Sequence, residues 1–343
     1  MSEVMGEELL RVENLSKTFE IGGGFMRKPL LLRALQDISF SLKRGETLGI
    51  VGESGCGKST LGRCILQLLR PEEGRVLWLG RDLVKVHGEE MRKLRRDLQI
   101  IFQDPLASLN PRMTVGEIVA EPLKTLRPDL NAAQRKERVR TMMEGVGLQP
   151  DMVDRYPHEF SGGQAQRIGI ARSLITGPKL VVCDEPVSAL DVSIQAQILN
   201  LLSEIKERLG LTLIFISHNL SVVRHVSDRV MVLYLGRIVE LATGEDFYAD
   251  PKHPYSRALL TAVPIADPKR ARQRNIDALS GEIPSPINPP SGCTFRTRCR
   301  FAIGLCAEKR PPLESAGDGR LVACHRWREI DNSAAMEAQP AAV

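Results

Sequence analysis

The sequence has few aromatic residues, no long apolar run and no N-terminal stretch of the secretory type. Aromatic residues make up 4% of its 343 residues. No apolar stretch approaches the roughly 18 residues that a membrane-spanning helix needs, and segments such as Leu211–Ile216 have the length of a strand. The first ten residues, MSEVMGEELL, are acidic and lack the basic and apolar regions of a signal peptide. We therefore expect neither an integral membrane protein nor a secreted one, but a protein docked on a membrane protein remains compatible with this composition.

A strong excess of positive charge is also missing. The formal net charge is +5, and the densest basic run, Lys269–Arg274, contains no aromatic residue. Proteins that grip single-stranded nucleic acid combine a basic groove with aromatic side chains for stacking. We interpret the run as a solvated charged segment and expect no nucleic-acid partner. The 43% of hydrophobic and 26% of charged residues are typical of a soluble globular chain, and the length suits two domains or one domain with an appendage.

The hydrophobic pattern predicts an α/β fold with a mainly parallel core sheet. The apolar runs Leu180–Cys183 and Thr212–Ile216 enclose the helical segment Ser193–Leu209, which is the arrangement of a βαβ unit. The short apolar strand Thr47–Val51 precedes a glycine-rich loop and a helix at Leu61–Leu69. Further strands are expected at 8–20, 33–51, Arg75–Leu79 and Leu98–Phe102, with a hairpin at Arg229–Leu233 and Arg237–Leu241.

The loop at residues 52–59 has the sequence GESGCGKS and fits the phosphate-loop pattern G-x-x-x-x-G-K-[ST]. Glycines let backbone N–H groups turn inward around a phosphate, and the following helix directs its positive end at the anion. Lys58 would reach the β- and γ-phosphates of a nucleotide, and Ser59 would offer its hydroxyl to Mg²⁺. The preceding strand and the following helix provide the context that the motif requires.

A second acidic site follows the strand at residues 180–183. Asp184 is suited to hold Mg²⁺ through water, and Glu185 to polarise an attacking water. His218 follows the next predicted strand, at the end where α/β sheets place groups that contact ligands. We therefore expect His218 to contact the γ-phosphate.

The tetrapeptide Ser161–Gln164 (SGGQ) settles the class that the sequence resembles. Together with the phosphate loop, Gln103, Asp184–Glu185, Asp191 and His218, in this order, it is similar to the ATP-binding-cassette ATPases over residues 8–250. The resemblance implies a head-to-tail dimer with two ATP molecules at its interface, a RecA-like parallel core sheet, an antiparallel β subdomain and a helical subdomain at about 88–175. It assigns catalysis to Glu185, His218 and Gln103, and Mg²⁺ to Ser59, Gln103 and Asp184. It assigns ATP binding to Phe19, Gly52, Glu53, Ser54, Gly55, Cys56, Gly57, Lys58, Ser59 and Thr60, with Phe25 a weaker candidate for adenine, and the contact in trans to Ser161, Gly162, Gly163, Gln164 and Asp191.

A narrower resemblance is to the ATPase subunits of dipeptide and oligopeptide importers. It is carried by FQDPLASLNPRM at 102–113, RYPHEF at 155–160, DEPVSALD at 184–191, HPY at 253–255 and a cysteine-rich tail. It implies a peripheral protein on the cytoplasmic face of the inner membrane. The implied partners are a second, related ATPase, two transmembrane permease subunits that contact residues 103–113, and indirectly a solute-binding protein. ATP binding would close the ATPase dimer and hydrolysis would reopen it.

Two other functions remain open from the sequence. One is the same role for another solute, such as nickel, glutathione or a sugar, because the ATPase does not touch the solute. The other is a soluble cassette ATPase of translation or DNA repair. A single cassette, and only about 100 residues between the phosphate loop and SGGQ, disfavour that class. The sequence departs from the family pattern at Ala165, where a basic residue is frequent, and at Asn219, where aspartate is usual.

The resemblance also predicts domain boundaries and a role for the C-terminal cysteines. We expect an ATPase domain at 8–250, a small C-terminal domain at 251–330 and a flexible tail at 331–343. Cys293, Cys299, Cys306 and Cys324 have the spacing C-x5-C-x6-C-x17-C, without the C-x-x-C pairs of common zinc ribbons. Importer ATPases with a similar tail imply a structural [4Fe–4S] cluster on these thiolates. Zinc and four unrelated thiols are the alternatives, and a reducing compartment disfavours disulfides.

Overall fold

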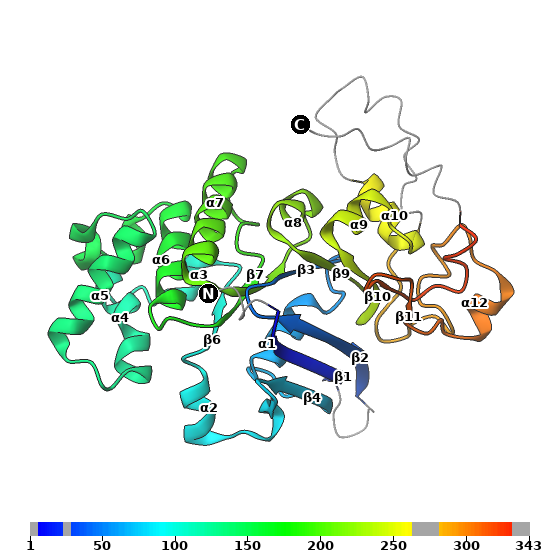
Figure 1. Cartoon of the computed structure of the whole chain (residues 1–343), viewed down its shortest axis with the longest axis horizontal. Helices are drawn as coiled ribbons and strands as arrows, with labels where there is room; N and C mark the ends of the chain where they lie inside the picture. The colour runs from blue at the N-terminus through cyan, green and yellow to red at the C-terminus, as the bar shows by residue number, and fades with distance from the viewer. Residues whose placement is uncertain (1–5, 23–28, 263–280, 331–343) are drawn as a thin grey trace.

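The computed structural model describes residues 6–22, 29–262 and 281–330, and in these ranges the chain forms two sheets with helices around them. The larger sheet crosses the middle of the molecule, and the smaller sheet lies beside it (Figure 1). The weaker adenine candidate Phe25, the basic run Lys269–Arg274 and the predicted tail at 331–343 lie outside the described residues.

The larger sheet has a parallel centre, as the sequence predicts. Strands β6, β7, β8, β3 and β9 run parallel, and β10, β12 and β11 extend the sheet in antiparallel fashion. Every residue of β3, β7 and β8 is buried, which explains why these strands are apolar throughout rather than alternating. In spatial order the strands are β11 (Glu314–Ser315), β12 (Leu321–Val322), β10 (Arg237–Thr243), β9 (Arg229–Tyr234), β3 (Thr47–Val51), β8 (Thr212–Ile216), β7 (Leu180–Asp184) and β6 (Leu98–Ile101).

The smaller sheet is antiparallel and packs its apolar face on the larger one. Its strands, in spatial order, are β2 (Leu30–Lys43), β1 (Glu8–Ile21), β4 (Glu73–Trp78) and β5 (Arg81–Asp82). Leu15, Ile38 and Trp78 from this sheet share one buried cluster with Leu48 and Ile50 of β3. This shared core holds the start of the chain against the strand that leads into the phosphate loop.

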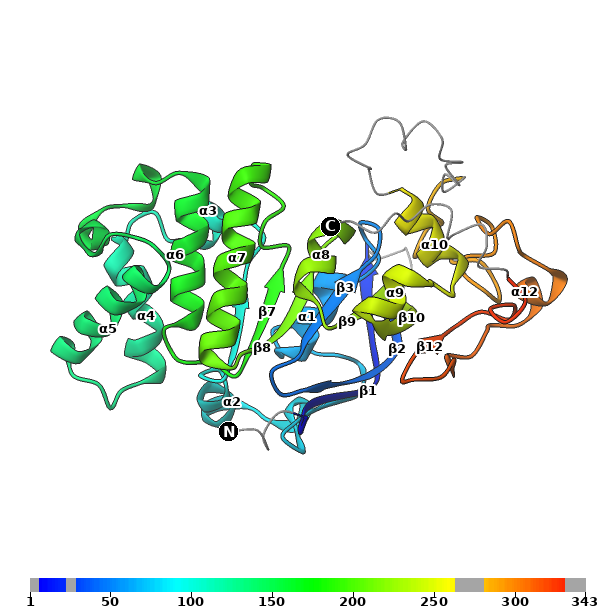
Figure 2. The same cartoon turned by 45° about the horizontal axis from the view of Figure 1, so that its top comes forward.

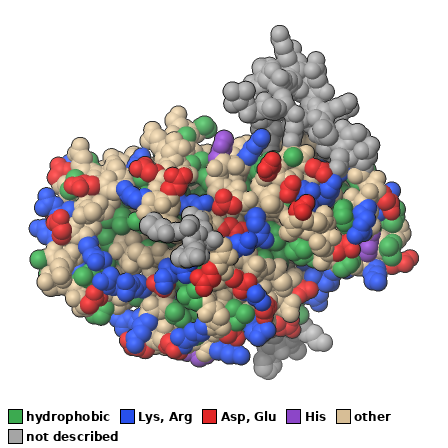
Figure 3. All heavy atoms as spheres, viewed as in Figure 1, with side chains coloured by type: hydrophobic (Ala, Val, Ile, Leu, Met, Phe, Trp, Pro, Cys, Tyr) green, Lys and Arg blue, Asp and Glu red, His purple; other side chains and the backbone are tan. Residues whose placement is uncertain are grey.

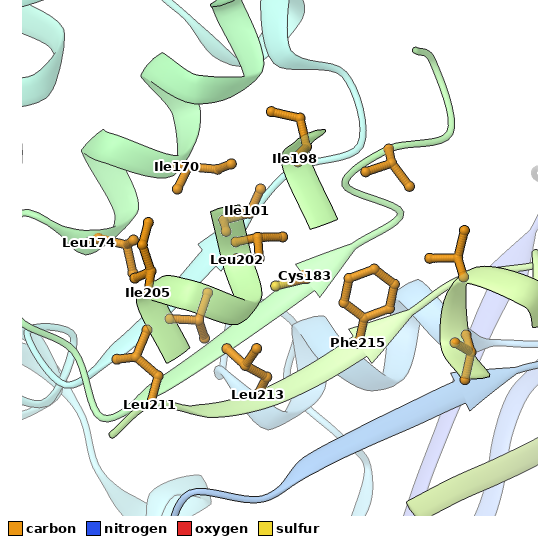
Figure 4. Close-up of a cluster of buried hydrophobic side chains, with 14 of the residues drawn as sticks. Ile101, Ile170, Leu174, Cys183, Ile198, Leu202, Ile205, Leu211, Leu213 and Phe215 are labelled. Atoms are coloured by element: carbon orange, nitrogen blue, oxygen red, sulfur yellow. The ribbon is translucent and has the colours of Figure 1, made fainter. Parts of the chain in front are cut away.

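Helices α6 and α7 cover the other face of the parallel strands, whereas α1 and α2 share the buried cluster of the smaller sheet. Figure 4 shows side chains of α6 and α7 meeting those of β7 and β8, among them Ile170, Leu174, Ile198, Leu202, Ile205, Cys183, Leu213 and Phe215. The helices of the described ranges are α1 (Lys58–Ile65), α2 (Gly88–Leu94), α3 (Pro105–Ser108), α4 (Val115–Leu126), α5 (Ala132–Gly145), α6 (Gly162–Leu174), α7 (Val192–Leu209), α8 (Leu220–Val226), α9 (Gly244–Ala249), α10 (Pro254–Thr261) and α12 (Gly304–Glu308), with 3-10 turns η1 (Leu83–Lys85), η2 (Pro150–Asp154) and η3 (Pro157–Glu159). Within the three described ranges, each helix is too short or too polar to cross a membrane.

The helical region expected at about 88–175 contains a strand of the core sheet. Helices α3 to α6 gather at one end of the molecule in both views (Figures 1 and 2). Strand β6, by contrast, pairs with β7 from Leu98 opposite Leu180 to Ile101 opposite Cys183. The helical layer therefore begins after β6, and the residue just beyond that strand, Gln103, is carried on the link between the sheet and the helices.

The described part of the C-terminal region shares the core of the preceding fold. Strand β12 pairs with β10, with Val322 opposite Glu240. Phe295 belongs to the same buried cluster as the side chains around β7, and its ring packs on the rings of Tyr234 and Tyr255. Buried Glu240 accepts hydrogen bonds from the backbone N–H groups of Lys252 and His253. The structure therefore does not confirm a separate Cys-containing domain, because residues 281–330 extend the larger sheet and contribute to its core.

His253 makes the stability of this junction dependent on pH. The residue is 1% exposed, caps α10, and accepts a hydrogen bond at Nδ1 from the backbone N–H of Tyr255 at 3.0 Å. Burial lowers the pKa of His253 from 6.5 to about 3. Between these values the unfolded chain binds a proton that the folded chain does not, so stability falls as the pH falls through this window.

We expect His253→Asn to flatten the dependence of the unfolding free energy on pH between pH 6.5 and 4. Asparagine retains a cap acceptor but does not titrate, which removes a slope that approaches about 1.4 kcal/mol per pH unit. The measurement is urea unfolding of both proteins at several pH values. His225→Asn, a change at an exposed position in α8, is the matched control and should keep the wild-type slope. Equal slopes for wild type and His253→Asn would contradict the prediction.

Candidate functional site

A cavity of about 560 Å³ opens beside the phosphate loop. Side chains from other parts of the fold line its wall, among them Phe19, Gln103, Glu185 and His218. The loop residues in the wall are Ser54, Gly55, Gly57, Lys58, Ser59 and Thr60, whereas Gly52, Glu53 and Cys56 do not line it. Gln103, Glu185 and His218 follow β6, β7 and β8, so the carboxyl ends of neighbouring parallel strands deliver them to one place. The volume lies within the range of pockets that bind small ligands.

The phosphate loop connects β3 to α1 through two glycines that touch other backbones. A Cβ atom on Gly52 would lie 2.3 Å from the carbonyl oxygen of Leu233, and one on Gly57 would lie 2.3 Å from that of Ala34. Both residues also have positive φ angles, of 148° and 102°. Gly57 caps α1 without a side-chain hydrogen bond, which leaves the first N–H groups of the helix available to an anion.

The two polar side chains at the start of α1 are already bound within the site. Lys58 is 5% exposed, and its Nζ donates to the carbonyl oxygens of Gly52 at 2.7 Å and Glu53 at 3.0 Å. Ser59 donates from Oγ to Oδ1 of Asp184 at 2.6 Å. The lysine thus holds the loop in its curved form, and the serine links α1 to the end of β7.

Glu185 lies where three segments meet. Its Oε2 accepts a hydrogen bond from Nε2 of Gln103 at 3.1 Å and lies 3.2 Å from Nδ1 of His218. Its backbone has a φ of 49°, in the left-handed region that non-glycine residues rarely adopt, and its N–H donates to the carbonyl of Ile216. The strand end therefore turns sharply at Glu185 and directs the carboxylate between the two other side chains. This arrangement suits a general base that acts on a water in the cavity.

Asp184 and Ser59 fit a magnesium ion by the chemistry of their donors. Asp184 is 3% exposed, and burial raises the pKa of its carboxyl, an effect opposed by the hydrogen bond from Ser59 and the charge of Arg63. Carboxylate and hydroxyl oxygens are the hard donors that Mg²⁺ prefers, and a cation here would compensate a buried negative charge. Gln103 reaches the same cavity from the end of β6.

The SGGQ residues lie outside this cavity. Ser161 caps α6 and accepts a hydrogen bond from the N–H of Gln164, whose side chain accepts one from the N–H of Ser161. A Cβ atom on Gly163 would lie 2.6 Å from Cγ2 of Ile194, so the glycine allows α6 and α7 to approach each other. Asp191 caps α7 without a side-chain hydrogen bond and is exposed. None of the residues assigned to the contact in trans lines the nucleotide-sized cavity.

The two departures from the family pattern have local structural roles. Ala165 is fully buried and belongs to the core cluster beneath α6, so a small apolar residue suits this position. Asn219 caps α8, and its side-chain oxygen accepts hydrogen bonds from the N–H groups of Ser221 and Val222. An aspartate at 219 would offer the same acceptor, so the cap explains why either residue suits the position.

Two residues to which the sequence assigned no role at this site hold the phosphate loop. The hydroxyl of Tyr255 accepts a hydrogen bond from the N–H of Glu53 at 2.9 Å. Arg298 binds the Glu53 carboxylate at 2.6 and 3.0 Å. The sequence assigned Glu53 to ATP binding, but its side chain and its N–H are both directed to these partners. Since the partners lie 202 and 245 residues away, no local pattern indicated their contacts with Glu53.

The structure does not support the predicted four-thiolate site. All four cysteines are free and partly buried, and within residues 6–22, 29–262 and 281–330 no group of three or more His, Cys, Asp or Glu side chains is arranged to hold a metal ion. Burial raises the pKa of Cys293 to about 11 and of Cys324 to about 12. These values describe the thiols without a metal, and ligation would release their protons, because a coordinated cysteine is a thiolate.

Comparisons with known proteins agree with this geometry. Residues 35–188 match the family model described as ABC transporter, and residues 239–306 match the one described as oligopeptide/dipeptide transporter, C-terminal region. The oligopeptide transport ATP-binding protein OppF of Haemophilus influenzae is 57% identical over 93% of this chain and 97% of its own length. OppF of Salmonella typhimurium is 57% identical over 90% of this chain and 93% of its own length, and AppF of Bacillus subtilis is 50% identical over 95% and 100%.

Solved structures show the same fold over about two thirds of the chain. The ATP-binding cassette MJ0796, a dimer bound to ADP and Pi, matches with a TM-score of 0.62 and 30% identity, covering 68% of this chain and 98% of that one. The structure of cbiO1 from Clostridium perfringens, part of the ABC transporter complex cbiONQ, matches with a TM-score of 0.61 and 30% identity over 71% and 92%.

The phosphate loop, the carboxylate at the end of β7 and the matched fold together define an ATP-binding-cassette ATPase. Family models and full-length relatives narrow this class further. The chain belongs to the family of ATP-binding proteins of oligopeptide and dipeptide transporters.

Proposed function

We propose that this chain is the ATP-hydrolysing subunit that energises an importer of dipeptides or oligopeptides. The carrying observation is Glu185, held between Gln103 and His218 in the wall of the phosphate-loop cavity. The names of the relatives and the match of residues 239–306 support peptide import. We assign ATP hydrolysis to residues 8–250 and an ancillary role to 251–330.

The contacts divide the chemical work among the assigned residues. The loop N–H groups and Lys58 would bind the phosphates, and Phe19 would stack on the adenine. Asp184, Ser59 and Gln103 would hold Mg²⁺, which neutralises phosphate charge when bound. Glu185 would accept a proton from the attacking water, while Gln103 and His218 keep its carboxylate oriented toward the cavity.

The second half of each ATP site would come from another subunit. Ser161–Gln164 and Asp191 do not line the cavity of their own chain, although they belong to the pattern that the family uses for ATP. A helix N-terminus at SGGQ can stabilise a phosphate presented by a partner. We therefore propose a head-to-tail pair with a second, related ATPase subunit.

The membrane partners would contact the segment at residues 103–113. Phe102, just before this segment, and Leu106, within it, are large apolar side chains with 36% and 48% of their surface exposed. On the face shown in Figure 3, Lys and Arg are interspersed with Asp and Glu, so exposed apolar side chains are more specific candidates for docking than charge. We propose two permease subunits as the partners, a solute-binding protein acting through them, and a peripheral location on the cytoplasmic face of the inner membrane.

We expect Glu185→Gln to keep ATP binding and to reduce hydrolysis by at least about 100-fold, the lower end of the contribution of a general base. The amide fills the same space between Gln103 and His218 but cannot accept the proton. Phosphate release by the assembled importer measures turnover, and size-exclusion chromatography with ATP measures trapping of the closed dimer. Hydrolysis at the wild-type rate would disprove the assignment.

We expect Lys58→Ala to weaken ATP binding to the isolated chain, because it removes a charge-assisted contact to the phosphates. Ser161→Arg should leave this binding intact and block closure of the dimer, because Ser161 lies outside the cavity of its own chain. Equilibrium titration with a fluorescent ATP analogue separates the two effects. The trans arrangement would be wrong if Ser161→Arg weakened binding to the isolated chain as much as Lys58→Ala does.

The iron–sulfur site remains a prediction from the sequence. What supports it is the spacing of the four cysteines and the hydrogen bond from the N–H of Cys293 to the carbonyl oxygen of Cys306 at 2.8 Å, which brings the first and third cysteines side by side. Anaerobic purification should give a coloured protein with about four irons and four sulfides per chain. A colourless protein with one zinc would replace the cluster with zinc, and four freely alkylated thiols without metal would eliminate the site.

A further inference from the structure

A buried ion pair links the C-terminal segment to the phosphate loop. Arg298 donates from Nη1 to Oε2 of Glu53 at 2.6 Å and from Nη2 to Oε1 at 3.0 Å, so the guanidinium binds the carboxylate at two points. The Arg298 side chain is only 3% exposed and that of Glu53 is 21% exposed. The pair is therefore shielded from water, where such a two-point contact fixes geometry more firmly than a surface ion pair does.

Aromatic rings hold Arg298 in this position. The guanidinium carbon lies 5.9 Å from the centre of the Tyr234 ring, at the end of β9. Phe295, three residues before Arg298, packs edge-on against Tyr234 with ring centres 5.3 Å apart, and at the same distance from Tyr255. Tyr255 in turn accepts the N–H of Glu53. The segment at 293–299 is thus anchored by an aromatic cluster directly beneath the loop.

The N–H, the carboxylate and the carbonyl oxygen of Glu53 each have a hydrogen-bond partner, and the partner of the carbonyl oxygen is Lys58. Tyr255 holds the backbone N–H, Arg298 holds the carboxylate, and the carbonyl oxygen accepts a hydrogen bond from Nζ of Lys58 at 3.0 Å. Glu53 does not line the nucleotide cavity, but the next residue, Ser54, does. A change in the position of Glu53 would therefore move both the loop N–H groups and the lysine that would bind phosphate.

We propose that Arg298 is a positioning residue for the phosphate loop, so that the segment at 293–299 sets the affinity for ATP from outside the nucleotide cavity. The proposal rests on ATP binding at this loop, as proposed above. Arg298 acts through Glu53 and touches neither the cavity nor Glu185. Its removal should therefore weaken nucleotide binding while leaving the hydrolytic step nearly unchanged.

The first test compares Arg298→Ala with wild type in the full chain. We expect the Kd for Mg-ATP to rise about tenfold, within the usual range of coupling between two sites. In the assembled importer, KM should rise while kcat at saturating ATP changes by less than about twofold, because the residues around Glu185 are untouched. The Kd of Arg298→Lys should lie between those of wild type and Arg298→Ala, since an ammonium keeps the charge but cannot bind the carboxylate at two points.

The second test is a double-mutant cycle with Glu53→Gln, which preserves size and removes the charge. Arg298→Ala should change the Kd by no more than about twofold in the Glu53→Gln background, since both substitutions break the same pair. Equal weakening in both backgrounds would overturn the proposal. Arg296→Ala is the matched control in the same segment, because Arg296 binds Ser291 rather than the loop, and its Kd should equal that of wild type.

These experiments distinguish failure of the positioning role of Arg298 from failure of the proposed function. Lys58→Ala serves as the reference for loss of binding in the same titration. If Lys58→Ala binds ATP as wild type does, the proposed ATP site is wrong. If Lys58→Ala loses binding while Arg298→Ala keeps the wild-type Kd and thermal stability, only the positioning role is overturned. If Arg298→Ala does not fold, Arg298→Lys and Glu53→Gln carry the test, and an unchanged Kd in both would reject the proposal.

Discussion

The close approach of the phosphate loop to two other backbones is the constraint on which the site depends. Gly52 leaves no room for a side chain against the carbonyl of Leu233, and Gly57 leaves none against that of Ala34. The N–H of Gly236, in the turn between β9 and β10, also donates to the carbonyl of Cys56 at 3.0 Å. The loop, the first half of β2 and the β9–β10 turn therefore keep one relative position. Since protein interiors are close-packed, a shift in any one of them must be matched by the others.

Because of this constraint, the C-terminal region helps to support the nucleotide site. The β9–β10 hairpin that supports the loop is the same hairpin to which β12 is added, and Tyr234 at the end of β9 packs against Phe295. Buried Glu240 on β10 lies 3.7 Å from Arg320. Truncation of one partner of such a buried pair would leave an uncompensated charge, so the hairpin and the C-terminal residues depend on each other for stability. A region that looks like an appendage in the sequence is thus part of the support for the loop.

Local patterns in the sequence predicted those site residues that belong to a motif or follow directly after a strand. The order strand, loop, helix located residues 52–59, and the apolar runs before Glu185 and His218 placed these side chains at neighbouring strand ends, where the structure joins them. Strands β11 and β12 were not predictable, because two residues are too few to show alternation. Nor was the role of Glu53: the motif specifies the backbone course of the loop but not the direction of this carboxylate. Its partner Arg298 is defined only by the tertiary fold.

The same construction would let the two half-sites of the proposed dimer close without either having to fold. Lys58 and Ser59 begin α1, and Ser161 caps α6 through reciprocal hydrogen bonds with Gln164, so each half-site is built on the first turn of a packed helix. The phosphate loop is wedged between backbones, and Gly163 fits α6 tightly against Ile194. Ordering a flexible loop at closure would cost conformational entropy for every residue fixed. In the proposed dimer both half-sites are already ordered in the folded subunits. ATP would therefore bridge two preformed surfaces without this entropy cost.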